Sequence, residues 1–307
     1  RPTRRKTLRN RRTRLIAAPL AVVVALALAG CTQAQLQGWM PSQPGLTNHV
    51  DRVMGLWTTS WIVLLAVGLI TWGLMIWAAV AYRRRKGQTG LPVQLRYHMP
   101  IEIFFTIVPV ILVAGFFAFT ARDQAIIEEP IEDPDYAITV YGKRWAWDFE
   151  YDREGQEPVH YQSIQVQEEP DSSQLDASTL PTLMLPTNSS IEITLESRDV
   201  AHSFWIVEFL YKKDMLPGVT NRMYFETGDQ EGILAGKCAE LCGEFHSAML
   251  FNVELVSPEE YDAYLESLEQ QGFVGAIGED LNTNTGDGNI DPERDESVDT
   301  TNEGEGE

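Results

Sequence analysis

The hydrophobic pattern divides the chain into two long apolar stretches followed by many short ones. Residues 56–82 contain no charged side chain, and residues 101–120 contain a single one, Glu102. Each stretch is long enough for a membrane-spanning helix, which needs ~20 apolar residues. The loop between them begins Arg-Arg-Arg-Lys at 83–86, and basic loops are typical of the cytoplasmic side. The pattern therefore predicts a transmembrane helical hairpin over residues 56–121 with both ends outside the cytoplasm.

After the second apolar stretch, short runs rich in β-branched and aromatic residues alternate with turn-forming residues. Such a series predicts an antiparallel β-sandwich or barrel. The runs are 136–151, 159–166, 182–185, 190–196, 203–209, 223–227 and 248–256. A helix should follow, because Ser257, Pro258 and Glu260 form a helix start with a capping box. Gly272 would end this helix, so we assign residues 122–272 to a β-rich domain.

The beginning of the chain has the character of a targeting segment. Residues 1–14 hold eight Lys or Arg and no acid, and an apolar run over 15–29 follows, as in a secretory signal. Leu28-Ala29-Gly30-Cys31 resembles a bacterial lipoprotein box, which predicts a signal peptide over 1–30 and a lipid on Cys31. An ordinary signal with an incidental cysteine is the alternative. Residues 31–55 would then be an extracytoplasmic approach to the membrane.

Charge is distributed very unevenly. Residues 123–307 hold nine Lys or Arg against 42 Asp or Glu, a net charge of −33, whereas the whole chain carries −20. This acidity makes a nucleic-acid partner improbable and favours a cationic protein partner for the soluble region. The last stretch, residues 273–307, is acidic and rich in Gly, Asn and Thr, which predicts a disordered tail.

The sequence Cys-Ala-Glu-Leu-Cys-Gly-Glu-Phe-His-Ser-Ala-Met at 238–249 carries most of the candidate chemistry. Thiolate and thioether are soft ligands, and imidazole suits copper as well as zinc. A closed zinc site has no use for Met249, whereas redox copper sites use a weak axial thioether. A disulfide between Cys238 and Cys242 is the alternative, because paired extracytoplasmic cysteines usually form one. The nearby His246 and Met249 favour a metal site.

A second histidine must come from elsewhere in the chain, and His202 is the best candidate. The loops at one end of a β-sandwich converge, so His202 can reach the motif despite the intervening residues. Another concentration of aromatic residues lies at 142–151, where alternation would place Trp145, Trp147, Phe149 and Tyr151 on one face of a strand. A buried aromatic ladder is the simplest interpretation for most of them.

The motif, taken with His202, resembles the binuclear copper A site of cytochrome c oxidase subunit II. The match extends from about Trp57 to about Val256 and implies a cupredoxin-like domain. The resemblance implies that two coppers share the thiolates of Cys238 and Cys242. It further implies one copper-binding histidine each at His202 and His246, with Met249 and the carbonyl of Glu240 as weak axial ligands.

The same resemblance implies roles for residues outside the copper ligands. Trp145 would take up the electron from a cytochrome c. Asp199 with nearby acids would help to dock this donor, and the alternative is that a single acid on so acidic a domain is simply solvated. Glu102 stands in the family's Pro-x-Glu-x-x-x-Thr-x-x-Pro context and would mark the mouth of a proton pathway, although a simple interfacial position is the alternative. The carboxylate of Glu240 would help to bind a magnesium ion at the boundary with subunit I.

The resemblance implies subunit II of a bacterial haem–copper cytochrome c oxidase (EC 7.1.1.9) in the cell membrane, with its copper domain extracytoplasmic. It would pass electrons from a cytochrome c, or from a haem-c donor in a supercomplex, to haem in subunit I, alongside other oxidase subunits. A membrane-anchored copper-delivery protein without redox turnover is the alternative from another class. A nitrous oxide reductase also uses copper A, but the tandem spans argue against it. No Cys-x-x-Cys-His motif for a fused haem domain is present.

Overall fold

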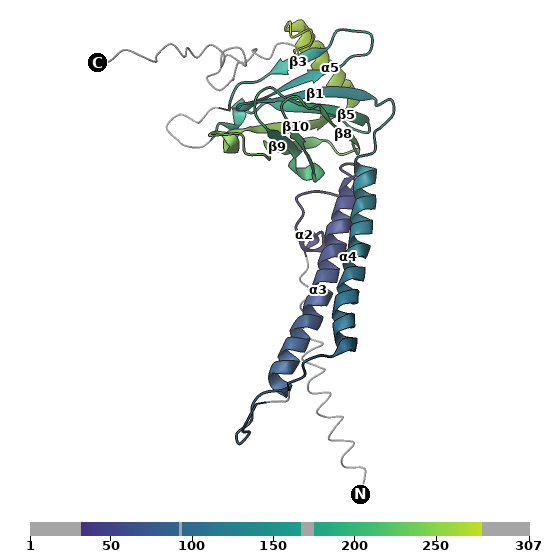
Figure 1. The fold of residues 1–307 in the computed structure, drawn as a ribbon. Coiled ribbons are helices and arrows are strands. Elements are labelled where there is room, and N and C mark those ends of the chain that lie inside the picture. The colour runs from purple at the N-terminus through teal and green to yellow at the C-terminus, as the bar shows by residue number, and fades with distance from the viewer. Residues whose placement is uncertain (1–31, 92–93, 167–174, 278–307) are drawn as a thin grey trace, which may run out of the picture. The chain divides into compact units, whose positions relative to one another are not determined.

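The computed structural model describes residues 32–91, 94–166 and 175–277 (Figure 1). The predicted signal peptide, Cys31 and most of the predicted acidic tail lie outside the described residues. The chain divides into two compact units. Of the described residues, one unit comprises 32–40 and 54–78, and the other comprises 41–53 and those from 79 to 277.

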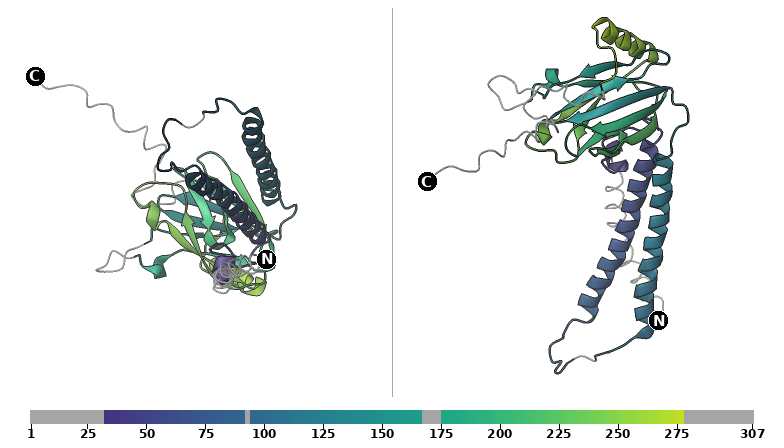
Figure 2. Two further views of the ribbon diagram at one scale, coloured as in Figure 1. Left: turned by 90° about the horizontal axis from the view of Figure 1, so that it is seen from below. Right: turned by 45° about the horizontal axis from the view of Figure 1, so that its top comes forward.

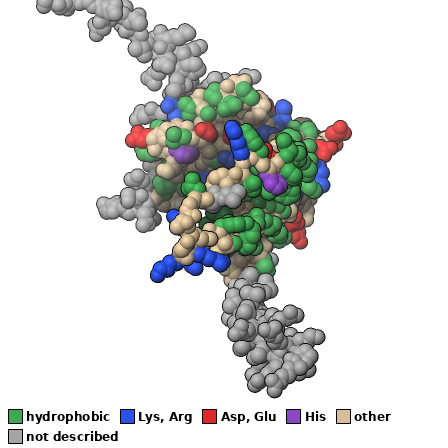
Figure 3. Space-filling model, turned by 60° about the horizontal axis from the view of Figure 1, so that its bottom comes forward, with side chains coloured by type: hydrophobic (Ala, Val, Ile, Leu, Met, Phe, Trp, Pro, Cys, Tyr) green, Lys and Arg blue, Asp and Glu red, His purple; other side chains and the backbone are tan. Residues whose placement is uncertain are grey.

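Two long helices confirm the predicted apolar spans. Helix α3 covers Val50–Ala81 and helix α4 covers Met99–Ile127, and both are long and apolar enough to cross a membrane. Their apolar side chains are exposed and form much of the green surface in Figure 3. Helix α3 begins before its apolar stretch and α4 continues after its own. Backbone hydrogen bonds between residues four positions apart form with polar side chains as well, so a helix does not have to end where the apolar residues end. A short helix, α2 (Gln33–Leu36), precedes α3.

The soluble domain is a sandwich of two five-stranded sheets (Figures 1 and 2). The first sheet has the order β3-β2-β1-β5-β8 and the second β4-β10-β9-β6-β7. The strands are β1 (Tyr136–Lys143), β2 (Ala146–Tyr151), β3 (Val159–Gln162), β4 (Thr182–Pro186), β5 (Ser190–Ser197), β6 (His202–Ile206), β7 (Tyr211–Met215), β8 (Asn221–Glu226), β9 (Gly232–Cys238) and β10 (Leu250–Val256). Short 3₁₀ turns are η1 (Ala177–Thr179), η2 (Val207–Phe209) and η3 (His246–Ala248).

The hydrophobic pattern of the sequence predicts the sandwich, but it does not predict every strand. Strands β7 and β9 were not predicted, because β7 alternates exposed Lys and Asp side chains at a sheet edge and β9 contains two glycines and one lysine. The run 136–151 divides into β1 and β2, which pair with each other. The sheets are also not wholly antiparallel, since β1 pairs with β5 and β4 with β10 in parallel. A crossover connection between the sheets produces such parallel neighbours.

Aromatic rings from the two sheets meet in the centre of the sandwich. Trp147 of β2 lies edge-on to Phe204 of β6 and Phe251 of β10, with centroids 5.6 Å and 5.2 Å away. Phe204 and Phe251 stack at 5.0 Å. Burying side chains of this size stabilises the fold by ~1.5–3 kcal/mol each. The predicted buried ladder is therefore confirmed for Trp147, Phe149 and Tyr151, whereas Trp145 lies in the turn before β2 and is partly exposed.

The C-terminal segment of the domain packs against the sandwich. Helix α5 (Pro258–Gln270) starts with the predicted capping box and contacts β3 and β4 (Figure 1). Beyond it, His160 N–H donates to the carbonyl of Phe273, and Gly275 N–H donates to that of Pro158. Ile277 is buried. The ordered domain thus continues past the predicted boundary at residue 272.

Residues 41–49, which directly precede α3, belong to the same unit as the sandwich. Gly228 N–H donates to the carbonyl of Leu46 at 3.0 Å, and Asn48 N–H donates to that of Glu226 at 3.0 Å. Leu46 and Val50 are buried. The polar approach predicted over residues 31–55 is therefore in part a strand-like extension of the β-domain.

Candidate metal centre

Neighbouring strands of the second sheet bring the predicted metal donors together. His202 begins β6 and Cys238 ends β9, and these strands pair with Phe204 opposite Cys238. The loop after Cys238 returns through η3 to β10, where Cys238 N–H donates to the carbonyl of Met249 at 3.0 Å. Because the two ends of the loop are hydrogen-bonded, all of its donors stay at one end of the sheet.

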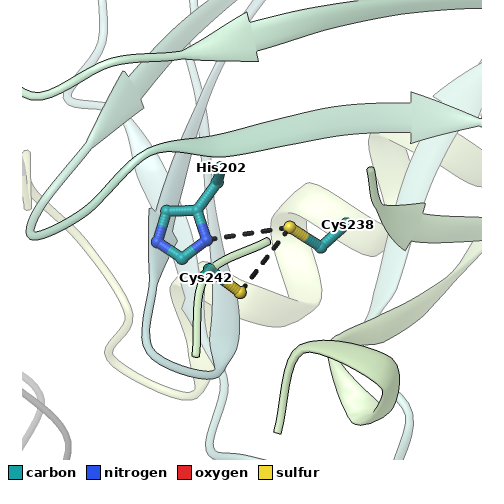
Figure 4. A group of neighbouring side chains, drawn as sticks. All are labelled: His202, Cys238 and Cys242. Carbon is teal, nitrogen blue, oxygen red and sulfur yellow. Dashed lines mark hydrogen bonds between the residues drawn. The ribbon is translucent and has the colours of Figure 1, made fainter. Parts of the chain in front are cut away.

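Three of the donors form a buried group (Figure 4). The Sγ atom of Cys238 lies 3.8 Å from Nδ1 of His202 and 3.8 Å from Sγ of Cys242. These three atoms all lie within 4.8 Å of one another, a spacing that can hold a metal ion. Side chains that sequence separates by 36 positions are thus brought together, as predicted for His202.

The remaining predicted donors surround the same two sulfurs. His246 Nδ1 lies 3.5 Å and Met249 Sδ lies 3.7 Å from Sγ of Cys242. The carbonyl oxygen of Glu240 lies 3.2 Å from Sγ of Cys238, while the Glu240 residue itself is exposed. Two thiols, two imidazoles, a thioether and a carbonyl therefore converge, and this mixture of soft ligands and imidazoles fits copper.

The alternative of a disulfide does not hold in the structure. Cys238 and Cys242 are both free thiols, and their sulfurs are 3.8 Å apart, whereas a disulfide bond measures about 2.05 Å. The hydrogen bond from the Cys242 thiol lowers the pKa of Cys238 by more than burial raises it. The neighbouring Cys238 sulfur in turn raises the pKa of Cys242. A metal ion would replace the proton that the two sulfurs share, because thiolate is the ligand form.

Asp199 orients His202 instead of facing a partner protein. Its side chain is fully buried, and its Oδ1 accepts a hydrogen bond from His202 Nε2 at 2.7 Å. Although burial opposes the charge, hydrogen bonds from His202, Val200 N–H and Arg144 N–H lower the pKa of Asp199. An ionised carboxylate only accepts, so Nε2 carries the proton and Nδ1 is free to bind a metal. The expected docking role of Asp199 is therefore wrong, because its carboxylate does not reach the surface.

Strand β1 of the other sheet leaves room for the His202 ring at one glycine, Gly142. A Cβ atom at Gly142 would lie 3.1 Å from Cδ2 of His202, closer than a side chain tolerates without displacing the ring. The carbonyl of Gly142 accepts from Arg198 N–H at 2.9 Å, and the buried Arg198 guanidinium lies 3.4 Å from Asp148. These contacts hold the ends of β1 and β5 together directly before Asp199. The sequence pattern alone did not indicate this support.

Trp145 rests on the metal-binding loop. Its indole Nε1–H donates to the carbonyl of Cys242 at 3.1 Å, and its ring lies edge-on to Phe245 with centroids 4.9 Å apart. The guanidinium of Arg144 lies 6.0 Å from the Trp145 ring. Trp145 is partly exposed, and its hydrogen bond links it directly to the loop that carries the donors. Sequence reasoning selected Trp145 but missed Phe245, although an aromatic residue next to a ligand histidine is a detectable signal.

Glu102 lies far along the chain from the metal donors, in the first turn of α4. Its Oε1 accepts a hydrogen bond from His98 N–H at 2.8 Å, and His98 Nδ1 accepts one from Ile101 N–H at 3.4 Å. This reciprocal arrangement satisfies amide groups that a helix start leaves without partners. Thr106 donates to the carbonyl of Glu102 at 2.8 Å. Glu102 thus caps α4, a function compatible with either of the interpretations given above.

Comparison with known proteins decides the family. Residues 136–256 match the family described as "Cytochrome C oxidase subunit II, periplasmic domain". The probable cytochrome c oxidase subunit 2 of Streptomyces avermitilis is 37% identical over 292 residues, covering 88% of this chain and 91% of that protein. The chain belongs to the cytochrome c oxidase subunit II family. The subunit 2 of Mycobacterium tuberculosis is 30% identical and covers 82% of this chain and 81% of its own length.

A solved structure is also similar to part of the chain. The periplasmic domain of cytochrome oxidase subunit II from Bradyrhizobium japonicum is 26% identical, with a TM-score of 0.40. The match covers 47% of this chain and 100% of that domain. The predicted fold class is confirmed: two membrane-capable helices precede a cupredoxin-like β-domain. Family membership makes the chain a subunit of a respiratory oxidase that works with other oxidase subunits, and it does not favour the copper-delivery alternative. The apolar helices and the periplasmic-domain family fit a membrane-anchored subunit with an extracytoplasmic domain.

Replacing Asp199 by Asn is expected to weaken copper binding by about 10- to 100-fold, because outer-shell partners of metal-binding histidines have effects of this size. Asparagine keeps the shape but loses the charge that fixes the His202 proton on Nε2. Copper affinity is measured by competition with a chelator. Glu196→Gln is the matched control, since Glu196 lies on β5 and its carboxylate binds Thr220. Equal affinities for the two variants would show that Asp199 does not support the ligand.

Proposed function

We propose that this chain accepts electrons one at a time from a c-type cytochrome at a binuclear copper A centre and passes them to haem in subunit I. The observation that supports the proposal most strongly is the convergence of four donors, namely two imidazoles, a thioether and a carbonyl, on two free sulfurs 3.8 Å apart. Two coppers would be held by the shared thiolates of Cys238 and Cys242. His202 and His246 would each bind one of them, and Met249 with the Glu240 carbonyl would be the weak axial donors.

The arrangement of the chain's own residues suits rapid electron transfer. Both sulfurs, His202 and Met249 are buried, so water is largely excluded from the donors and little solvent has to reorganise. The hydrogen bond between Cys238 N–H and the Met249 carbonyl holds the loop closed, and Asp199 holds His202. When bound, copper supplies a one-electron redox couple. The protein supplies the donors and holds them in place through these hydrogen bonds.

Electron uptake is assigned to Trp145 within this proposal. The indole lies partly exposed and is hydrogen-bonded to the carbonyl of a thiolate ligand, Cys242. A path from a docked donor through the indole to the sulfur is therefore short and continuous. The acidic composition of the domain would attract a basic cytochrome, which mainly raises the encounter rate and weakens with salt.

Mixing the purified oxidase with a reduced, basic cytochrome c tests this function. Copper is expected to be reduced before haem, with a second-order rate that falls as salt is added and a later internal step that salt leaves unchanged. Haem reduction that precedes or bypasses copper would be incompatible with the proposed route.

We further infer that the Glu240 carboxylate contributes to a magnesium site shared with subunit I. Glu240 is exposed although its carbonyl lies 3.2 Å from a sulfur of the metal group. The side chain thus remains available to a hard cation, for which carboxylate oxygen is a preferred ligand. A single residue would then connect the copper site with the subunit boundary.

Glu102 is proposed as the mouth of a proton pathway into subunit I. Glu102→Gln removes the titratable proton but keeps an oxygen that can accept from His98 N–H, so the helix cap survives. Copper reduction is expected to stay within about twofold of normal, while proton-coupled turnover falls by about 10²-fold or more, the range for losing a proton-transfer group. Flow–flash measurement of both steps checks this. Normal turnover in Glu102→Gln would leave Glu102 as a helix cap only.

A further inference from the structure

Phe245 is an aromatic residue of the metal-binding loop that no ligand role explains. It directly precedes His246 and forms the N-cap of η3, and its side chain is 36% exposed. Its ring meets the Trp145 indole at a centroid distance of 4.9 Å and an interplanar angle of 70°. This edge-to-face geometry is a favoured arrangement of aromatic pairs.

Four contacts surround the Trp145 indole, and one of them is the Arg144 guanidinium 6.0 Å from its ring. Its Nε1–H is bonded to the Cys242 carbonyl at 3.1 Å, and its six-membered ring covers Gly243, where an added Cβ would lie 3.1 Å from Cζ2. Gly243 has a φ of +119°, a conformation that side chains other than glycine rarely adopt. The hydrogen bond fixes one atom of the indole, Nε1. Gly243 has no side chain and therefore only provides the space that the indole occupies. Phe245 is the aromatic contact, and its edge-to-face packing opposes turning of the ring about the hydrogen bond.

We propose that Phe245 is a positioning residue for electron uptake, holding the Trp145 indole against the metal loop. This inference rests on the proposed role of Trp145. The step it serves is the transfer of one electron: the donor haem iron is oxidised from ferrous to ferric, the copper centre gains one electron, and no bond is made or broken. Electron transfer slows steeply as the gap between donor and acceptor widens, so a tilted indole slows the step even when every copper ligand is intact.

Substitutions at this position separate an aromatic contact from simple apolar packing. Phe245→Leu and Phe245→Met keep apolar volume but remove the ring, whereas Phe245→Tyr keeps the ring edge. Leu241→Ala is the matched control, because Leu241 lies in the same loop and is 76% exposed. Using two non-aromatic variants keeps the comparison decisive if one of them fails to fold.

The first measurement needs no metal. Hydroxyl-radical footprinting of the copper-free full-length chain, followed by mass spectrometry, reports the exposure of Trp145. Oxidation of Trp145 is expected to rise about three- to tenfold in the Leu and Met variants, the factor that an aromatic contact of ordinary strength represents. It should be unchanged in Phe245→Tyr and in Leu241→Ala. Equal oxidation in Phe245→Leu and the parent chain would overturn the proposal.

The second measurement is the first-order transfer step in the copper-loaded oxidase, started by photoreduction of a bound, ruthenium-labelled basic cytochrome c. Phe245→Leu is expected to slow this step about three- to tenfold, and Phe245→Tyr to restore it. The double variant with Trp145→Leu should be no slower than Trp145→Leu alone, because Phe245 acts through that residue. Additive losses would overturn the positioning role. Normal transfer in Trp145→Leu would instead overturn the proposed uptake site itself.

Discussion

Serine in place of either Cys238 or Cys242 is expected to abolish the binuclear copper centre and to reduce electron uptake to background. Each sulfur lies near the other sulfur and near one imidazole, so each would serve two metals. A serine hydroxyl is a hard, weakly acidic ligand and does not replace a bridging thiolate. The visible spectrum and the copper content of the purified variant check this outcome.

Met249→Leu provides the graded control for the cysteine variants. The thioether lies 3.7 Å from Cys242 and is expected to be a weak axial ligand, so its loss should change the redox potential or copper occupancy and keep two coppers. Met249 is also fully buried, and leucine preserves its volume. A Cys238→Ser chain that keeps the parent spectrum and activity would show that the thiolates do not bridge.

Trp145→Ala is expected to retain copper and to slow electron transfer from the donor by roughly 10²-fold or more, a loss typical of a disturbed reaction geometry. The indole is not a ligand, and the hydrogen bond to Cys242 that disappears contributes only about 1 kcal/mol. Donor affinity should fall much less than the transfer rate, because docking depends on charge. Flash photolysis of the donor complex separates the two quantities.

Trp205→Ala is a suitable control for the Trp145 variant. Trp205 is a partly exposed tryptophan of β6 in the same domain, and the Nζ atom of Lys237 lies 4.5 Å from the centre of its ring. If Trp145→Ala loses its copper, Trp145 is a packing residue. Trp147 would be the next candidate, yet its complete burial between the sheets makes direct contact with a donor impossible.

The convergence of the candidate donors could be predicted because most of them are close together in the sequence. Five of the six donors lie within twelve residues, and their spacing fits no simpler site. The long-range partner His202 was found because a sandwich brings loop ends together. The helices were equally predictable, since an uninterrupted apolar stretch has few alternatives to a membrane-spanning helix.

Features that depend on the register of distant strands could not be predicted. Asp199 looks like one more surface acid of an acidic domain, and only the pairing of β1 with β5 shows that its carboxylate is buried behind His202. The sequence of β9 lacks a strand-like pattern. The strand forms because β10 and β6 pair with it on both sides. Trp145 was expected on a strand but lies in a turn, where Gly243 and Phe245 form its support.

The electron paramagnetic resonance spectrum of the copper-loaded full-length chain tests the binuclear centre most directly. One unpaired electron shared between two copper nuclei through the sulfurs of Cys238 and Cys242 should give hyperfine structure from both nuclei. The copper content should be two ions per chain, and both signals should disappear in Cys242→Ser. A spectrum with hyperfine structure from a single copper nucleus, at one ion per chain, would contradict the binuclear site.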